Sequence, residues 1–344
     1  MNNLRISELI EKYKLPKFRA KQFREAFFEK HYRSFEEMTN LPKNLRQELT
    51  ENESVLCLKE SVVLKSSDKV TYKALLELSD GQKIESVLMS PKPGLWTACI
   101  SSQVGCAMKC TFCATGTMGL TRNLTNEEIT DQVLFWRQYI AKNSVTERLN
   151  NVVYMGMGEP LHNTANVFPS LAELTNPETF NIGSRHVSVS TSGLLKAVEQ
   201  MADQFPQINL AISLHAAKDD LRTSLMPVNK AFDLNKVRNC LNAYIKKTHR
   251  KIFIEYILLE GENNRVSDAE DLAVFLKSLD RPELTHTNLI VYNETDAHHE
   301  SSTKAKADAF RNTIKDRGLS VTIRKNLGRD IDGACGQLAV NNED

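Results

Sequence analysis

Strand and helix patterns alternate along most of the chain, from about residue 97 to about residue 324. Apolar segments typical of buried strands occur at 97–101, 151–155, 186–190, 208–214, 251–259, 287–292 and 320–324. Helical patterns lie between them, and the capping box Thr125-Asn126-Glu127-Glu128 begins the first helix. Strands joined by helices form right-handed units around a mostly parallel sheet. Because six such units are too few for a closed barrel of eight, we predict an α/β fold with an open, partial (β/α)6 barrel.

The first 90 residues follow different patterns. Residues 1–50 predict short helices, and residues 55–90 predict short strands joined by turns at residues 66–68 and at Asp80-Gly81. The tetrapeptide Pro91-Lys92-Pro93-Gly94 then favours a boundary. We therefore expect a small helical and β accessory domain over residues 1–90, followed by a barrel domain over residues 91–344 whose C-terminal segment contains Cys335.

Charge and hydropathy restrict the class of protein. Hydrophobic residues make up 41% and charged residues 25% of the chain, as in globular proteins. No apolar run approaches the roughly 18 residues that span a bilayer, and the first residues lack a secretory signal pattern, so we expect a cytoplasmic protein without a membrane anchor. Residues 1–50 hold eleven basic and seven acidic side chains. Lys17, Lys21 and Arg24 lie there at helical spacing, which indicates either a solvated helix face or a surface for phosphate groups.

Three of the seven cysteines lie close together in the sequence. Cys106, Cys110 and Cys113 follow the first predicted strand of the barrel, where ligand sites of parallel α/β folds form. An odd number of cysteines argues against a secreted disulfide framework. Three thiolates can hold three irons of a [4Fe–4S] cluster and leave the fourth iron open. A zinc site would need another ligand, and the closest histidine is His162; three inert cysteines would leave their spacing unexplained.

Around these cysteines the chain resembles the radical S-adenosylmethionine superfamily, and in particular its adenine-methylating branch. The matching segments are Ser102–Cys106, Phe112–Gly116, Met155–Pro160, Ser190–Gly193, Ser213–His215 and Ala334–Leu338. This branch comprises dual-specificity rRNA/tRNA adenine-C2 methyltransferases and their adenine-C8 relatives. The resemblance implies a partial barrel with a [4Fe–4S] cluster and S-adenosyl-L-methionine as cofactors. It also implies an RNA substrate, rRNA before tRNA, bound with the help of the N-terminal domain.

Residue by residue, the resemblance implies a ligand site at the ends of the strands. Cys106, Cys110 and Cys113 are expected to hold the cluster, whose open iron binds the methionine part of S-adenosylmethionine. The expected contacts with S-adenosylmethionine are Gly158, Glu159, Ser190, Ser213, Leu214, His215 and Asn293.

The resemblance also implies three catalytic residues outside that group. Cys335 takes a methyl group from one S-adenosylmethionine, a step that needs its thiolate. A second S-adenosylmethionine is cleaved reductively, and the resulting radical abstracts hydrogen from the S-methyl group, whose carbon then adds to adenine. Glu85 matches a proton acceptor. Cys99 attacks the sulfur of Cys335 and releases the methylated base as a disulfide forms.

Three hypotheses for the function stay open. Pro160 favours methylation at C2, because C2 enzymes resemble Gly-Glu-Pro where C8 relatives tend to Gly-Glu-Ala. The segments 113–116 and 123–134 look closer to the C8 relatives, which modify 23S rRNA and confer resistance to ribosomal antibiotics. A non-enzymatic iron–sulfur carrier or regulator would leave Cys99 and Cys335 without a role. For the enzyme we expect a monomer and a reductant such as flavodoxin or ferredoxin.

Overall fold

The computed structural model describes residues 1–295 and 298–339, and its centre is a parallel sheet. The neighbouring parallel strands are β4 (Leu95–Cys99), β7 (Asn151–Tyr154), β8 (Val187–Thr191), β9 (Asn209–Ser213), β10 (Ile252–Leu258), β11 (Thr285–Val291) and β12 (Val321–Ile323). Each pairs in parallel with the next. Valine, isoleucine and leucine dominate their buried positions, as expected for strands covered on both sides.

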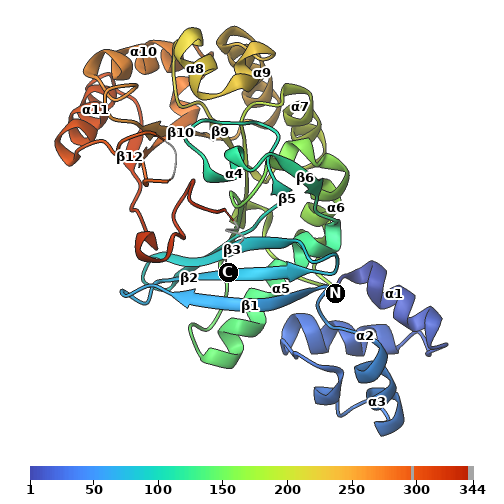
Figure 1. Cartoon of the computed structure of the whole chain (residues 1–344). Helices are drawn as coiled ribbons and strands as arrows, with labels where there is room; N and C mark the ends of the chain where they lie inside the picture. Colours follow the sequence, from blue (N-terminus) through green and yellow to red (C-terminus); the bar gives the residue numbers. More distant parts are fainter. Residues whose placement is uncertain (296–297, 340–344) are drawn as a thin grey trace.

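Six helices connect these strands and cover the outside of the sheet (Figure 1). They are α5 (Asn126–Asn143), α6 (Thr164–Thr175), α7 (Leu195–Gln204), α9 (Leu234–Thr248), α10 (Val266–Lys277) and α11 (Lys304–Asp316). The predicted capping box begins α5, where the Thr125 side chain accepts from the Glu128 N–H and the Glu128 carboxylate accepts in return. The prediction of an open, partial (β/α)6 barrel is therefore confirmed.

Three antiparallel strands extend this sheet beyond β4. They are β1 (Leu58–Lys65), β2 (Thr71–Leu78) and β3 (Lys83–Lys92). Strand β3 also pairs with β4, and Pro93-Gly94 lies in the turn between the two strands. The chain thus changes from helices to the common ten-stranded sheet between Asn52 and Leu58. The division into domains at residue 90 stays a prediction.

The N-terminal helices form a lobe beside α5 (Figure 1). They are α1 (Asn3–Lys12), α2 (Arg19–Arg24), a π-helical turn (Glu25–Glu29) and α3 (Lys43–Asn52). The lobe has an aromatic core, in which Phe35 meets both Phe23 and Phe27 edge to face. Its contact with the barrel includes a hydrogen bond from the Gln138 side chain to the Tyr32 carbonyl, with a length of 2.7 Å.

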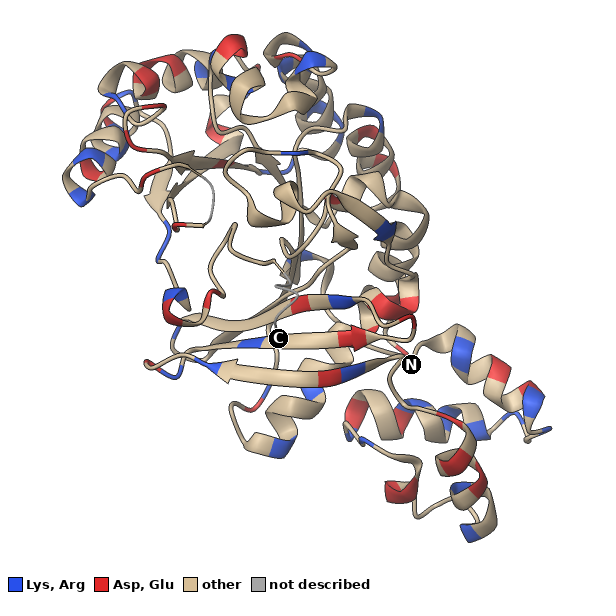
Figure 2. Cartoon of the chain, in the orientation of Figure 1, with Lys and Arg blue, Asp and Glu red and all other residues tan. Residues whose placement is uncertain are grey.

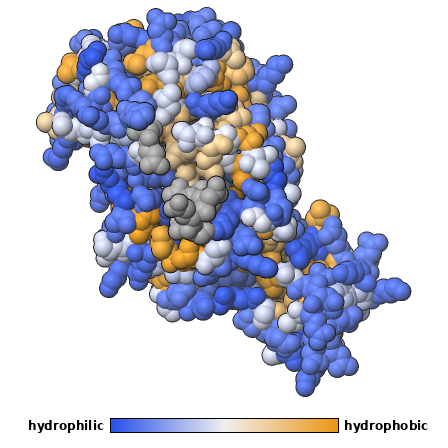
Figure 3. Space-filling model, viewed as in Figure 1, coloured by the Kyte–Doolittle hydropathy of each residue, from blue (hydrophilic) through white to orange (hydrophobic). Residues whose placement is uncertain are grey.

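Two irregular segments complete the fold near the strand ends. A small hairpin of β5 (Gln103–Gly105) and β6 (Leu120–Asn123), with helix α4 (Ala114–Thr117), frames the cysteine loop. The C-terminal segment, residues 324–339, crosses back over the antiparallel strands, where the Ser67 N–H donates to Asp330 at 2.8 Å. Hydrophilic residues cover most of the face in Figure 3, with a paler, mildly hydrophobic area above β1–β3. Within the described ranges, none of the helices combines the length and apolarity that crossing a bilayer requires.

Candidate active site

A cavity of about 170 Å³ opens at the carboxyl ends of β7, β8 and β9. This is the edge of a parallel sheet where the fold builds ligand sites. Most of the predicted site residues line it: Cys106, Cys110, Cys113, Gly158, Glu159, Ser190, Ser213, His215 and Cys335. The sequence motifs, although far apart along the chain, therefore meet in one place.

The cysteine loop is held by backbone hydrogen bonds to three other segments. The Cys106 N–H donates to Gly119 at 2.8 Å, the Thr111 N–H to Leu225 at 3.0 Å, and the Ala114 N–H to Gly336 at 2.9 Å. Burial raises the pKa of Cys106 to about 12. Burial also raises the pKa of the Cys110 and Cys113 thiols. The loop is thus rigid, and its thiols are protonated unless a metal takes the place of the proton.

The donor set fits an iron–sulfur cluster. Cys106, Cys110 and Cys113 line the same cavity. Among residues 1–295 and 298–339, no group of three or more His, Cys, Asp or Glu side chains is placed to hold one metal ion. In a cluster each thiolate binds a separate iron, so the three sulfurs need not converge on a point. Thiolate ligands favour iron–sulfur clusters, zinc or copper(I). A cluster with one open iron needs three thiolates, and this loop provides three cysteines.

Gly158 and Glu159 end the loop after β7 in a fixed conformation. The Glu159 carboxylate is buried and accepts from the Ser192 N–H at 2.7 Å and from the Leu161 N–H at 3.1 Å. Burial raises the pKa of this carboxyl, and the backbone donors lower it. Gly158 has a φ of +97°, and a Cβ there would lie 2.5 Å from the Gln103 Cβ. The carboxylate is thus pre-oriented at the cavity, where its free lone pairs can accept from an ammonium group.

Polar residues at the carboxyl ends of β8 and β9 also line the cavity. The hydroxyl oxygens of Ser190 and Ser213 lie 3.4 Å apart. The Leu214 side chain is buried in the core and does not line the cavity, so only its backbone is available to a ligand. The His215 Nδ1 accepts from the Ile257 N–H at 3.0 Å, and burial lowers the His215 pKa to about 3. His215 is therefore a neutral imidazole whose Nε2–H is a donor.

Arg222, in helix α8 (Asp219–Leu225), is a buried residue that the sequence analysis missed. Its guanidinium donates to the carbonyls of Leu214 at 3.1 Å and Ser192 at 2.8 Å, and to the Asn229 side chain at 2.7 Å. The arginine therefore fixes the ends of β8 and β9 relative to each other. An arginine in a polar stretch of sequence normally has an exposed side chain, so the sequence carries no signal for this buried role.

Cys335 and Asn293 meet at the C-terminal segment. The Asn293 side-chain amide donates to the Cys335 carbonyl at 3.2 Å. The Asn293 Oδ1 is buried and has no hydrogen-bond partner among the described residues, and the same holds for the Ser192 hydroxyl. Unpartnered buried polar atoms beside a cavity are costly unless a ligand satisfies them. The Asn293 Oδ1 and the Ser192 hydroxyl fit as hydrogen-bond partners for the polar groups of S-adenosylmethionine.

Cys99, at the end of β4, and Glu85, in β3, are not among the residues that line the cavity. Burial raises the pKa of Cys99 and of Cys335, and the guanidinium of Arg324 lowers both. Arg324 itself donates to the buried Glu255 carboxylate at 3.3 Å. Both thiols therefore face one cation, and both are free in this structure.

The basic residues of the N-terminal lobe have different environments. Lys17 and Lys21 are exposed, and Lys21 lies 3.7 Å from Glu25. Arg24 pairs with Glu178 of the barrel at 3.4 Å, so it connects the lobe to the barrel instead of completing a free stripe. Figure 2 shows basic and acidic residues mixed on these helices.

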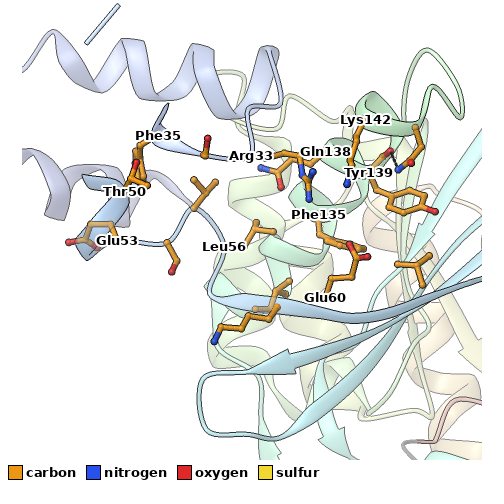
Figure 4. Close-up of a pocket in the computed structure, with 17 residues that line it drawn as sticks. Arg33, Phe35, Thr50, Glu53, Leu56, Glu60, Phe135, Gln138, Tyr139 and Lys142 are labelled. Carbon is orange, nitrogen blue, oxygen red and sulfur yellow. Dashed lines mark hydrogen bonds between the residues drawn. The ribbon is translucent and has the colours of Figure 1, made fainter. Parts of the chain in front are cut away.

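A larger hollow, of about 570 Å³, lies between the N-terminal lobe, β1 and α5. Arg33, Glu53, Tyr139 and Lys142 are among its lining residues (Figure 4). It shares no lining residue with the cysteine cavity and contains none of the predicted site residues. Most of the predicted site residues therefore lie at the smaller cavity, and none lies at the larger hollow.

Comparisons with known proteins agree with this geometry. Residues 100–276 match the family model of the radical SAM superfamily, and residues 1–55 match that of the ribosomal RNA large subunit methyltransferase N-terminal domain. The probable dual-specificity RNA methyltransferase RlmN of Listeria welshimeri is 41% identical over 336 residues, 97% of this chain and 90% of that protein. The protein of the same name from Streptococcus mutans is 42% identical over 327 residues, 94% of this chain and 90% of that protein.

A crystal structure of a radical SAM methyltransferase from Sphaerobacter thermophilus has the same fold. Its TM-score is 0.91 at 37% identity, with 98% of this chain and 97% of that chain covered. The resemblance seen in the motifs is thus confirmed: the chain belongs to the radical SAM superfamily and, within it, to the RlmN family of dual-specificity RNA methyltransferases.

Proposed function

We propose that this protein methylates carbon 2 of adenine in rRNA, with tRNA as a second substrate. One observation carries the proposal: a single cavity is lined by the three loop cysteines, the strand-end polar groups and the thiol of Cys335. The similar proteins named as dual-specificity RNA methyltransferases support an RNA substrate and do not favour the C8 alternative. A simple electron carrier would leave Cys335 in that cavity without a role.

In this proposal Cys106, Cys110 and Cys113 hold the [4Fe–4S] cluster. When bound, the cluster supplies the electron for reductive cleavage of S-adenosylmethionine. Glu159 accepts hydrogen bonds from the amino group of that ligand, and its backbone donors keep the carboxylate in place. The neutral His215 donates from Nε2, and the ligand satisfies the free Oδ1 of Asn293.

Cys335 and Cys99 act in turn on the methyl group. The Cys335 thiolate forms a bond to the methyl carbon as the sulfonium bond of S-adenosylmethionine breaks. Once the 5′-deoxyadenosyl radical has taken a hydrogen atom from the S-methyl group, the resulting carbon radical would join adenine. Glu85 would then accept the proton from the ring carbon, and the ring radical would give up one electron to the oxidised cluster. The Cys99 thiolate then forms a disulfide with Cys335. The electron pair of the broken sulfur–carbon bond goes to the carbon, which takes up a proton to become the methyl group of the product. Arg324 supports both thiolate steps, because its charge lowers the pKa of the two buried thiols.

The remaining partners of the proposal are the RNA and a reductant. Exposed lysines of the N-terminal lobe, Lys17 and Lys21, can contact phosphates without reading sequence. A low-potential electron carrier such as flavodoxin or ferredoxin would reduce the cluster. The target base must leave its stack to reach the cavity, as it does in other base-modifying enzymes.

The proposal is tested by cleavage of S-adenosylmethionine and methyl transfer under anaerobic, reducing conditions. The cluster-loaded protein should release 5′-deoxyadenosine and transfer labelled methyl to adenosine of rRNA. Cys110→Ala should do neither, because it removes a cluster ligand. Cys240→Ala is the matched control, since Cys240 is a buried cysteine in α9 outside the site, and it should retain both activities. Methyl transfer by Cys110→Ala, or unmethylated RNA with the loaded wild type, would contradict the proposal.

A further inference from the structure

Lys73 and Glu85 form a buried ion pair on the antiparallel strands, next to the C-terminal segment that carries Cys335. In the antiparallel pairing of β2 and β3, Lys73 lies opposite Val87 and Leu75 lies opposite Glu85. Lys73 and Glu85 are therefore diagonal neighbours on the same face of the sheet. The Lys73 Nζ is 2.9 Å from the Glu85 Oε1, and the side chains are only 12% and 5% exposed.

The sheet face that carries the ion pair also carries Cys99 of the candidate active site. Val87 lies opposite Cys99 in the pairing of β3 with β4, so the ion pair and the Cys99 thiol share one face. The other face packs on α5, where the Trp136 indole donates to the Ser86 hydroxyl at 2.9 Å. The pair is thus on the side of the sheet that also receives the C-terminal segment.

The C-terminal segment supplies the other groups that face the Glu85 carboxyl. The Asp332 carboxylate raises the Glu85 pKa, and the backbone N–H of Ala339 lowers it. The largest influence is burial, which raises the pKa, and the next is the Lys73 ammonium, which lowers it. The segment with Cys335 therefore lies over the same carboxyl that Lys73 holds.

Half of the carboxylate is left without a partner. The Glu85 Oε2 is buried and has no hydrogen-bond partner of normal geometry among the described residues, although the Ala339 N–H is close enough to lower the pKa of the carboxyl. A buried ion pair is weak evidence for stability, because desolvation offsets the attraction. An unsatisfied oxygen adds a further cost. A charged group kept in this state beside the segment that carries Cys335, on the sheet face that also carries Cys99, is better explained by catalysis than by stability.

We propose that Lys73 is a positioning residue for Glu85: its ammonium holds Oε1, so that the carboxylate stays ionised and presents the free Oε2 to the adenine. The inference rests on the proposed function, in which Glu85 is the proton acceptor. In that step the C–H bond of the ring carbon breaks, an O–H bond forms on Oε2, and the bonding pair stays in the ring. The ring radical would then give up one electron to the oxidised iron–sulfur cluster, which makes the ring aromatic again. Lys73 remains protonated throughout and touches no substrate.

The test compares Lys73→Gln, which removes the charge and keeps a donor, with Lys73→Arg, which keeps the charge. Lys59→Gln is the control, since Lys59 is an exposed lysine of β1. The first readout is the infrared band of protonated Glu85, measured against pH on cluster-loaded protein and assigned by subtracting Glu85→Gln. The midpoint of this titration is the pH at which half of Glu85 is protonated. It should rise by about 1–3 pH units in Lys73→Gln, because an opposite charge at this distance lowers a carboxyl pKa by that much. The midpoint should stay near the wild-type value in Lys73→Arg and Lys59→Gln.

The second readout is the pH profile of kcat for RNA methylation. The acidic limb in Lys73→Gln should move to higher pH by the same amount as the infrared midpoint, with KM for RNA unchanged. In Lys73→Arg the acidic limb of the pH profile should lie at its wild-type pH. An unchanged midpoint in Lys73→Gln, or a midpoint that moves without the limb, would overturn the positioning role while wild-type methylation remains. If the wild type methylates no RNA, the proposed function fails, and the role of Lys73 fails with it.

Discussion

Replacing Gly158 by alanine should damage both the fold and the S-adenosylmethionine site. The φ of +97° at Gly158 is unfavourable for alanine, so the backbone alone should lower the free energy of unfolding by about 1–2 kcal/mol. The new Cβ would lie 2.5 Å from the Cβ and 2.7 Å from the Cγ of Gln103. Gln103 cannot move freely, because its Oε1 accepts from the Glu159 N–H at 2.8 Å. Crowding of a packed site costs about 1–3 kcal/mol more.

We therefore expect Gly158→Ala to lower the free energy of unfolding by about 2–5 kcal/mol, the sum of these two effects. Gly261→Ala is the matched control, because Gly261 has a φ of +74° and nothing within 4 Å of its added Cβ. The control should show only the backbone effect, about 1–2 kcal/mol. Urea unfolding of anaerobically purified protein measures the difference between the two variants.

The same substitution should weaken binding of S-adenosylmethionine. Displacement of Gln103 moves the Glu159 backbone, and a loss of about 1.4 kcal/mol in this contact lowers affinity tenfold. Equilibrium dialysis of the cluster-loaded protein would measure it, with Gly261→Ala expected at the wild-type value. Equal destabilisation of the two variants together with normal binding by Gly158→Ala would refute the reasoning.

Three further predictions concern the thiols, the cluster and the RNA. Cys99→Ala should accumulate a covalent protein–RNA complex that survives denaturation, whereas Cys335→Ala should form none, because it has no methyl acceptor; a cross-link in Cys335→Ala, or in neither, would contradict these roles. Anaerobic reconstitution should yield about four irons and four sulfides per chain, and one metal ion per chain would instead indicate zinc. Replacing Lys17 and Lys21 by alanine should weaken RNA binding and flatten its salt dependence, because fewer counterions are released; an unchanged salt slope would assign both lysines to plain solvated surface.

The barrel could be predicted from the sequence because its signals are local. Each buried strand is a short apolar run followed by a helical pattern, and the Thr125–Glu128 capping box begins α5 where the sequence indicates. The β5–β6 hairpin was missed, because strands of three and four residues carry no recognisable alternation. Pro93-Gly94 lies in the turn between β3 and β4, and the domain boundary expected there stays a prediction, since proline and glycine mark both hairpin turns and linkers.

Most of the predicted site residues meet in one cavity, whereas their contacts with distant segments could not be predicted from the sequence. The cysteine spacing and the strand-end motifs are local signals, and these residues meet in one cavity. The ion pair of Lys73 with Glu85 depends on the register of β2 and β3, which the sequence does not state. The role of Arg24 depends on how the N-terminal lobe packs on the barrel. Such contacts join segments that are distant in sequence, so the hydrophobic periodicity of either segment does not predict them.

The position of the methyl group tests the central claim most directly. The cluster-loaded protein would be incubated with rRNA, reductant and S-adenosylmethionine with a labelled methyl group, and the RNA digested to nucleosides. The modified adenosine would then be compared with authentic standards and examined by NMR to identify the methylated carbon. We predict the label on C2 of adenine. Label on C8 or on a nitrogen, or no labelled adenosine, would contradict the account.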